Sequence, residues 1–453
     1  MTLKIAVYVP IRHAHSRFYK RDNFNNRVWK GLSVVLDVMK RAGIEYEYAG
    51  KETIHLYDIA LVSITAPIDY FYYIREWTYW KTPRPITILG GAGVMNVRPV
   101  LPAGDISILG RAEDLIIPVI EGIKKGLAHE SKSVIYHEAF DPDLRYYINQ
   151  APELYPHRIH SHREKGYDSE WTEQSIGCPN KCLFCSYTWH RKHLKSAAMI
   201  AAGSGEFPEW EDTIKEVVKA DEIPKRLTLV GLDGVSERLR RAVNKPIKRG
   251  EFRRFLELIA TREKPRKTRV FSIIGYPTEG PEDINELLED LALSQDVHPP
   301  RSRPMPMVSL RFLPFRPMPG TPLAIWPAAQ PEQLDQYHQI DLPKPRNIYT
   351  VVEYLESFTT SIIPLLILRG VEYDWETIQR LSLTPQAWTG KLFKRKRLIE
   401  KHVEIDRLIR RYAWEELPTR YIRTYIRPDI MQKAEAKATR YLETGVYHAD
   451  YTD

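Results

Sequence analysis

Residues 175–187 read Ser-Ile-Gly-Cys-Pro-Asn-Lys-Cys-Leu-Phe-Cys-Ser-Tyr and contain all three cysteines of the 453-residue chain. Cys178, Cys182 and Cys185 are spaced as C-x3-C-x2-C. The glycine and the proline that flank the first cysteine favour a tightly turned loop. Three thiols gathered this closely in a long chain are typical of a site that holds a metal or a metal cluster.

Three kinds of cysteine site can be weighed against this spacing. A disulfide framework needs an even number of cysteines and a short secreted chain, and neither condition holds. A zinc site needs four ligands, and His190 would complete C-x3-C-x2-C-x4-H, a spacing unlike the common zinc patterns. Iron–sulfur clusters are normally held by four thiolates, so three would leave one iron of a [4Fe-4S] cluster open. The spacing favours the cluster, with zinc as the alternative.

The cysteine pattern resembles that of a known enzyme family. With Phe184 before the third cysteine, C-x3-C-x-aromatic-C resembles the signature of the radical S-adenosylmethionine (SAM) enzymes. The resemblance implies that the three cysteines hold the cluster and that Phe184 packs near the adenine of SAM. It also implies that the open iron chelates SAM, which an electron cleaves to methionine and a 5′-deoxyadenosyl radical. An electron donor such as flavodoxin or ferredoxin would then be a partner.

Three later segments extend this resemblance. They are Gly-Leu-Asp-Gly-Val-Ser-Glu-Arg-Leu (231–239), Ile-Ile-Gly-Tyr-Pro-Thr-Glu (273–279) and Arg-Pro-Met-Pro-Gly-Thr-Pro-Leu (316–323). They are similar to the family's G-x-E-S-G-S-E, I-x-G-x-P-x-E and P-x-P-G-T-P-L elements. The first differs from the pattern in having Asp and Val where Glu and Gly are usual. No strand resembling the family's G-G-E element, which binds the SAM amino group, stands out after the cysteines.

The matching positions carry implied roles. Ser236 and Glu237 are expected to contact SAM, with Ser236 as a hydrogen-bond partner. Gly275 is expected to let the backbone approach the adenine. Tyr187 and His190, just after the loop, are candidates for donating a proton or hydrogen atom, and the alternative is that they pack beneath the loop.

The first part of the chain alternates strand and helix patterns. Strands are predicted at 3–9, 45–49, 59–65, 86–89 and 106–109, and helices at 28–42, 69–80 and from 112. This alternation predicts a parallel, doubly wound sheet, and ligands bind such sheets at the carboxyl ends of the strands. Ser63, Thr65, Gly90 and Gly91 are expected there.

The same segment resembles the cobalamin-binding domain that precedes the radical domain in one subfamily. On this resemblance the Gly-Gly turn and the Ser and Thr side chains would contact the corrin or its nucleotide tail. The cobalt-ligating D-x-H-x-x-G motif is absent from the sequence. Relatives without the motif include some that bind cobalamin and others that have lost it. Cobalamin binding is therefore left open, and the glycines can alternatively serve only a tight turn.

These patterns predict an α/β fold in four parts. A Rossmann-like, cobalamin-type domain (1–130) is followed by a linker (131–168), a partial (β/α) radical SAM barrel (169–328) and a helical C-terminal domain (329–453). The barrel strands are predicted at 171–176, 226–231, 269–274 and 308–313, with a helix at 281–294. C-terminal helices are predicted at 331–339, 350–369, 374–381 and 396–414.

The net charge of +8 is partly concentrated near the C-terminus. Between residues 391 and 411 nine Lys or Arg face three acids. Trp388, Phe393, Trp414, Tyr421 and Tyr425 are interleaved with basic residues nearby. Such a run is usually a solvated helix face over core aromatics, but it can also bind nucleic acid. The alternative function is therefore a radical SAM enzyme that modifies a DNA or RNA base.

The composition excludes other classes. No run of eighteen apolar residues occurs, so no membrane span is expected. The N-terminal apolar run is short and ends in proline, which predicts a strand rather than a signal peptide. An oxygen-sensitive cluster and reduced thiols suit a cytoplasmic location. The expected substrate is a small molecule or a peptide, which a methyltransferase would methylate if cobalamin is bound. Spacing does not identify that substrate.

Overall fold

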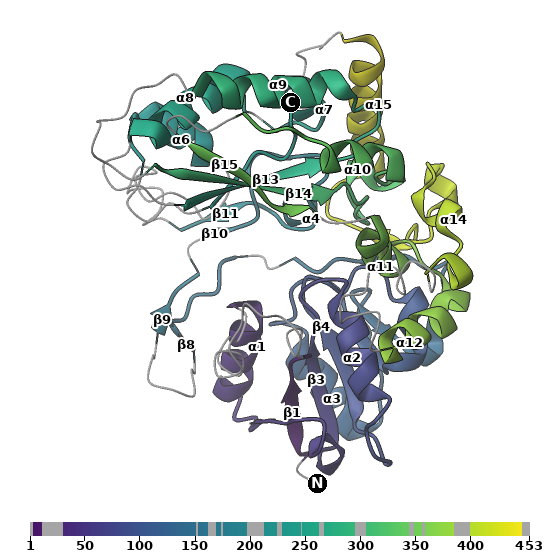
Figure 1. Cartoon of the computed structure of the whole chain (residues 1–453). Coiled ribbons are helices and arrows are strands. Elements are labelled where there is room, and N and C mark those ends of the chain that lie inside the picture. The colour runs from purple at the N-terminus through teal and green to yellow at the C-terminus, as the bar shows by residue number, and fades with distance from the viewer. Residues whose placement is uncertain are drawn as a thin grey trace.

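The structure, a computed structural model, forms two lobes (Figure 1). It describes residues 3–10, 30–150, 153–161, 169–173, 175–196, 213–223, 229–245, 247–261, 267–294, 305–343, 348–355, 358–384 and 399–445. The first lobe contains the N-terminal sheet, and the second lobe contains a separate parallel sheet with the cysteine loop beside it. The fold is mixed α/β.

The N-terminal sheet has six strands in the order β2-β1-β3-β4-β5-β6. Their bounds are β1 (Ile5–Tyr8), β2 (Glu47–Tyr48), β3 (Ile59–Ser63), β4 (Ile86–Gly90), β5 (Ile106–Ile108) and β6 (Val134–Tyr136). The first five strands are parallel and β6 is antiparallel to β5. The parallel order 2-1-3-4-5 is a doubly wound order, as the alternating pattern predicts.

Alternate residues of these strands enter two different cores. Ile5 and Val7 pack with α1 (Lys30–Arg41) and α3 (Ile116–Lys125). Ala6 and Tyr8 pack on the opposite face with α2 (Asp69–Trp77). Side chains point to opposite faces along a strand, so covering both faces explains why the strands read as continuous apolar runs.

The predicted boundary at residue 130 is wrong. β6 lies inside the predicted linker and completes the N-terminal sheet. The same linker contributes β7 (Tyr146–Tyr147), which pairs with β16 (Ile422–Arg423), and β8 (Ile159–Ser161), which pairs with β9 (Ser169–Trp171). These strands are only two or three residues long, too short for a period to be visible in the sequence.

The second sheet has four parallel strands in chain order. They are β12 (Leu229–Gly231), β13 (Lys267–Ile274), β14 (Met307–Pro314) and β15 (Tyr349–Leu355). Its helices are α6 (Thr213–Ala220), α7 (Glu237–Ala242), α8 (Arg249–Thr261), α9 (Pro281–Leu293) and α10 (Pro331–His338). Sequential parallel strands are the arrangement of a partial (β/α) barrel, and the described strands leave the sheet open.

The two faces of this sheet differ. Along β13, the alternate residues Thr268, Val270, Ser272 and Ile274 are buried, whereas Arg269, Phe271 and Ile273 between them are half-buried. The buried face packs against a core that includes Phe252 and Phe255 of α8. Figure 1 shows α8 and α9 above the sheet and the short β10–β11 pair below it.

The predicted helix at 350–369 is wrong in its first half. Residues 349–355 form β15, which extends the second sheet beyond the predicted boundary at 328, and the helix α11 is Phe358–Leu368. The segment Tyr-Thr-Val-Val-Glu-Tyr-Leu is rich in β-branched and aromatic residues, which suit a strand. Apolar residues at helical spacing continue across the junction and hide it.

The predicted long helix at 396–414 is also interrupted. Residues 399–402 are helical, α14 is Ile405–Ile409, and the chain is extended beyond it. The buried Arg369 donates to the carbonyls of Leu408 and Arg410, at 3.0 and 2.8 Å. Tyr412 N donates to Ile325 O at 2.9 Å. These tertiary hydrogen bonds replace the helical ones that the periodic pattern predicts.

The C-terminal helices do not form the separate domain that the sequence predicts. The helices α11 and α12 (Trp375–Leu383) share the apolar core of α2. The last helix, α15 (Pro428–Thr444), packs instead into the core of the second sheet, beside α7. The C-terminal part therefore completes both lobes.

The remaining elements are short. They are β10 (Ser175–Ile176), β11 (Leu194–Lys195), α4 (Ser186–Trp189) and 3₁₀ turns at Ile54–Leu56, Arg98–Ala103, His137–Ala139, Pro322–Ile325, Glu372–Asp374 and Trp414–Glu416. Among the described helices, none combines the length and the apolar character that crossing a bilayer requires.

Candidate functional site

The cysteine loop lies between two short elements. The antiparallel pair β10–β11 closes its base, and α4 begins directly after Cys185. Cys182 is buried, Cys178 and Cys185 are half-buried, and none forms a disulfide. Gly177 has φ +68°, and a Cβ there would lie 2.6 Å from the Lys192 carbonyl oxygen. The loop entrance therefore requires glycine.

Distant segments hold the loop in place. Leu183 N donates to Val243 O at 2.9 Å, just after α7. The Asn244 side-chain amide donates to two loop carbonyls, Asn180 O at 2.9 Å and Lys181 O at 3.2 Å. From the 316–323 segment, Leu323 N donates to Leu183 O at 3.4 Å.

Side chains after the loop also fold back onto it. Thr188 Oγ1 donates to Cys178 O at 3.0 Å, and Trp189 Nε1 donates to Cys182 O at 2.9 Å. With the contacts from Val243, Asn244 and the 316–323 segment, these bonds hold the loop's backbone in place.

Burial raises the pKa of two of the three thiols. It raises the pKa of Cys182 well above its usual range, and the nearby Lys245 ammonium opposes that rise. Burial also raises the pKa of Cys185, against the backbone N–H groups of Thr188 and Tyr187. Lys245 is itself buried and pairs with Asp233 at 2.8 Å. Thiols in this setting stay protonated at neutral pH unless a bound metal favours the thiolate.

The donor set fits a cluster better than a single ion. Within the described part of the chain, no three His, Cys, Asp or Glu side chains converge so that they could hold one metal ion. In a [4Fe-4S] cluster each thiolate binds its own iron, so the sulfur atoms need not converge on one point. Three thiols on one pre-positioned loop fit that requirement.

His190 lies beneath the loop. Its ring is buried, and Nε2 donates to Pro319 O at 2.7 Å, because a carbonyl can only accept. Burial lowers the pKa of His190 to about 4, so the ring is neutral. A Cβ on Gly320 would lie 2.8 Å from Nε2. These contacts favour the packing alternative for His190 over zinc ligation or proton donation.

Tyr187 and Phe184 differ in exposure. Tyr187 is 39% exposed, and the Arg191 guanidinium lies 4.6 Å from the centre of its ring. Phe184 is partly buried against the apolar core of the second sheet. Tyr187 is thus accessible from outside, whereas Phe184 belongs partly to the packing. Their predicted roles stay predictions.

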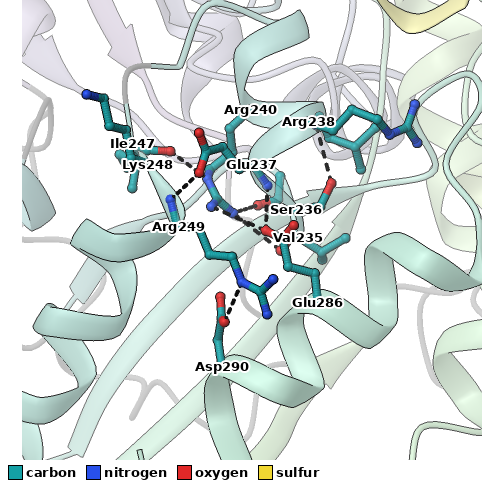
Figure 2. Close-up of polar contacts among 12 residues, drawn as sticks. Val235, Ser236, Glu237, Arg238, Arg240, Ile247, Lys248, Arg249, Glu286 and Asp290 are labelled. Atoms are coloured by element: carbon teal, nitrogen blue, oxygen red, sulfur yellow. Dashed lines mark hydrogen bonds and ion pairs between the residues drawn. The ribbon is translucent and has the colours of Figure 1, made fainter. Parts of the chain in front are cut away.

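Ser236 and Glu237 have partners within the protein. Ser236 Oγ accepts from Leu239 N at 3.3 Å, capping α7, and donates to Asp283 at 2.5 Å. Glu237 accepts from Arg249 N at 2.7 Å (Figure 2). Figure 2 also shows the Arg240 side chain directed at the turn around Val235. The predicted contacts with SAM receive no support from these bonds.

The 275–279 turn contacts the same region. Tyr276 OH donates to Asp233 O at 3.1 Å. Gly275 has φ +78°, and a Cβ there would lie 2.4 Å from the Cβ of Ala329. The structure thus gives Gly275 a packing requirement of its own, apart from the predicted approach to adenine.

The N-terminal sheet gathers the four residues predicted for its carboxyl edge. Ser63 and Gly90 are paired in register on β3 and β4. Thr65 donates through N and Oγ1 to Asp69, each at 2.7 Å. Gly91 has φ +114°, and a Cβ there would lie 2.5 Å from Ile64 O, whereas one on Gly90 would meet no atom of the described residues within 4 Å. Gly91 is needed for the turn, and Gly90 has open space beside it.

Hydrogen bonds tie this edge to the cysteine loop. Leu109 directly follows β5, and its carbonyl oxygen accepts a hydrogen bond from Asn149 N at 2.9 Å. The next residue, Gln150, accepts from Lys192 N at 3.0 Å and donates to His190 O. The segment just beyond the third cysteine is thus fastened to the N-terminal sheet.

A second tie precedes the loop. The Arg111 guanidinium donates to both carboxylate oxygens of Glu173, at 2.7 and 3.0 Å. Arg111 follows β5, and Glu173 comes just before β10. Sequence analysis missed Asn149, Gln150, Glu173 and Lys245 as site residues, since nothing in their local pattern distinguishes them.

The basic run near the C-terminus is largely paired where the structure describes it. Arg407 contacts both carboxylate oxygens of Asp374 at 2.6 and 2.7 Å. Arg410 pairs with Glu416 at 3.2 Å, and Arg411 pairs with Glu435 at 2.5 Å. The predicted basic residues 391–397, with Trp388 and Phe393, lie outside the described residues.

Two of the three described aromatic residues of that region serve packing. Tyr421 is fully buried and hydrogen bonds to Asn96 and to Val97 N, both at 2.9 Å. Trp414 packs against the core of the second sheet, whereas Tyr425 is 40% exposed and donates through its hydroxyl to Thr188 O at 3.4 Å. These contacts do not support a nucleic-acid surface.

Comparison with known proteins identifies no family. No protein-family model matches the chain, and no curated protein matches it. The chain is similar to solved structures of the cobalamin-dependent S-adenosylmethionine radical enzyme OxsB. The apo form has 11% identity and a TM-score of 0.27, over 88% of this chain and 56% of that chain.

Two ligand-bound structures of the same enzyme give a comparable result. The form with aqua-cobalamin has 12% identity and a TM-score of 0.22, over 88% of this chain and 56% of that one. The form with aqua-cobalamin and S-adenosylmethionine has 13% identity and a TM-score of 0.23, over 96% and 62%. The chain spans 56–62% of the length of these chains. At TM-scores this low, the likeness carries no argument about fold or function.

A buried carboxyl in the 275–279 turn makes stability depend on pH. Burial raises the pKa of Glu279 from 4.5 to about 7. Its oxygens accept from Tyr337 OH and from Tyr276 N, at 2.5 and 3.2 Å. Because the folded pKa is raised, this contribution to stability is present below the unfolded pKa and is lost as pH rises through about 7.

We predict that the wild-type free energy of unfolding falls with rising pH more steeply than that of Glu279→Gln between pH 4.5 and pH 7. The difference should total about 3 kcal/mol, which urea unfolding at fixed pH values can measure. Glu282→Gln is the control, since Glu282 is 72% exposed one turn away. Identical pH slopes for the wild type and Glu279→Gln would show that Glu279 ionises normally.

Proposed function

We propose that this chain is a radical SAM enzyme in which Cys178, Cys182 and Cys185 hold a [4Fe-4S] cluster. The observation that carries the proposal is the three-cysteine loop, which bonds from Val243 and Asn244, from the 316–323 segment and from Trp189 hold in place. When bound, such a cluster supplies the electron that cleaves SAM to methionine and a 5′-deoxyadenosyl radical.

The chain's own residues position and shield that site. Asn244 and Val243 hold the loop from one side, and Leu323 holds it from another. Lys245 lies near Cys182, where its ammonium favours the thiolate, although its partner Asp233 opposes that effect. Trp189 and His190 fill the space beneath, which keeps water from that side of the loop.

We further propose that the carboxyl edge of the N-terminal sheet is a corrin site. Two observations support this. The open space beside Gly90 lies at the strand ends, where ligands of doubly wound sheets bind. The bonds of Gln150 and Arg111 fasten this edge to both ends of the cysteine segment. A corrin there would make the enzyme a methyltransferase, and without it hydrogen abstraction would drive other chemistry.

The proposed substrate is a small molecule or peptide, with a flavodoxin or ferredoxin as electron donor. The alternative, modification of a nucleic-acid base, has less support. Arg407, Arg410 and Arg411 each pair with a carboxylate of the same chain, so their charges are already offset. A cytoplasmic location suits the oxygen-sensitive cluster that we propose.

We predict that anaerobic reconstitution of the wild type loads about four iron and four sulfide per chain. Cys182→Ala should lose the brown colour and most of the iron, because one of the three thiolates is missing. His190→Gln should keep the cluster, since the proposed role of His190 is packing. Metal analysis and electron paramagnetic resonance with and without SAM measure these outcomes.

A contrary result would be a colourless wild type that holds one zinc per chain and loses it in His190→Gln. That pattern would establish the zinc alternative and overturn the cluster.

We predict that the wild type, incubated with hydroxocobalamin and desalted, keeps about one corrin per chain. Gly90→Leu should retain less than about a tenth of that amount, because its side chain would enter the open space beside β4. Gly31→Leu is the control, since a Cβ at exposed Gly31 also meets no atom of the described residues within 4 Å. Absorption spectra measure retention. Equal retention by all three proteins, or none by the wild type, would contradict a corrin site at this edge.

A further inference from the structure

One face of the second sheet carries a group of charged side chains. On β13, Lys267 and Arg269 alternate with the buried Thr268 and Val270, so they lie on the face away from the core of α8. Arg311 of β14 and Glu353 of β15 join them from the neighbouring strands. We call these four residues the sheet-face cluster.

A single carboxylate organises the cluster. Glu353 accepts from Lys267 Nζ at 2.5 Å and from Arg311 Nε at 3.2 Å, and Arg269 Nε lies 3.4 Å away. Ser309 Oγ also donates to it. Three cations therefore surround one anion, which leaves two positive charges in excess.

The position of Glu353 results from an irregularity in the sheet. Leu310 pairs with Val352 and Arg311 pairs with Tyr354, so Glu353 is the extra residue of a β-bulge. Bulges change the direction of a side chain and are frequent beside functional sites. Here the bulge on β15 brings the Glu353 carboxylate toward cations of β13 and β14.

The cations are neither buried nor freely solvated. The side chains of Lys267, Arg269 and Arg311 are 35%, 35% and 29% exposed. Among the described residues, the buried Arg269 Nε has no hydrogen-bond acceptor, since its contact with Glu353 lacks hydrogen-bond geometry. The Arg311 guanidinium lies 5.4 Å from the ring centre of Phe271, which orients it further. Excess charge held in this way is offset best by an anion.

A chain of contacts links the strand that carries the cluster to the cysteine loop. Phe271 O accepts from Leu232 N at 2.8 Å and from Asp233 N at 3.3 Å. Asp233 pairs with Lys245, whose charge acts on Cys182. Arg269 comes two residues before Phe271, about 7 Å along β13. A ligand anchored at the cluster can therefore extend toward the cysteine loop.

We propose that the sheet-face cluster binds a carboxylate or phosphate group of the substrate, with Arg269 and Arg311 as the anchoring residues. The inference names the substrate class and so rests on the proposed function. Arginine presents a planar fork that matches both groups, and Glu353 holds the arginines in position without neutralising them. The substrate class is thus an anionic small molecule or an acidic peptide.

The test is calorimetric titration of the iron-free chain with inorganic phosphate and with succinate, at constant ionic strength. We expect the wild type to bind at least one of the two anions. Arg269→Gln and Arg311→Gln should bind it roughly tenfold more weakly, because each loses a charge-assisted hydrogen bond. Arg254→Gln should bind like the wild type, since the Arg254 side chain is exposed on the outer side of α8 and pairs with Asp221 and Glu257.

Two further measurements sharpen the result. Arg311→Lys keeps the charge and should recover part of the affinity, which a loss of folding would not allow. Preference for phosphate or for succinate tells the two anionic groups apart. No binding by the wild type, or equal binding by all variants, would overturn the proposal.

Since this titration needs no iron, it separates the two proposals. A chain that fails to load a cluster but loses phosphate affinity in Arg311→Gln would overturn the proposed function and retain the anion site.

Discussion

The hydrogen bonds of Gln150 are the constraint on which the arrangement of the site depends. Gln150 joins the strand ends of the N-terminal sheet to His190 and Lys192, just after the third cysteine. Arg111 makes the corresponding tie to Glu173, just before the loop. Because both ends of the cysteine segment are held, the loop stays fastened to the carboxyl edge of the N-terminal sheet.

Helices and strands that are long enough to show a regular pattern of apolar residues could be predicted from the sequence. The N-terminal alternation, the helix α9 and the strands β13 and β14 are each long enough for burial on one or both faces to be visible. The carboxyl-edge position of Ser63 and Gly90 follows from parallel pairing alone. The three neighbouring cysteines need no structural model to be noticed.

What the sequence could not predict depends on tertiary contacts. Residues 349–355 have apolar positions that continue into α11, so the change from strand to helix is hidden. Arg369 donates hydrogen bonds to the carbonyls of Leu408 and Arg410, which would otherwise have accepted the bonds that continue the helix beyond residue 409. Ser236 and Gly275 match motif positions but are also required for capping and packing. Glu353 reaches its three cations only because of a bulge.

The central claim is that the cysteine loop supports reductive cleavage of SAM. The most direct measurement is incubation of the reconstituted, dithionite-reduced protein with SAM, with the products separated by liquid chromatography and mass spectrometry. The account predicts 5′-deoxyadenosine and methionine in equal amounts, and neither above background in Cys182→Ala. A wild type that carries four iron per chain but forms no more 5′-deoxyadenosine than Cys182→Ala would contradict it.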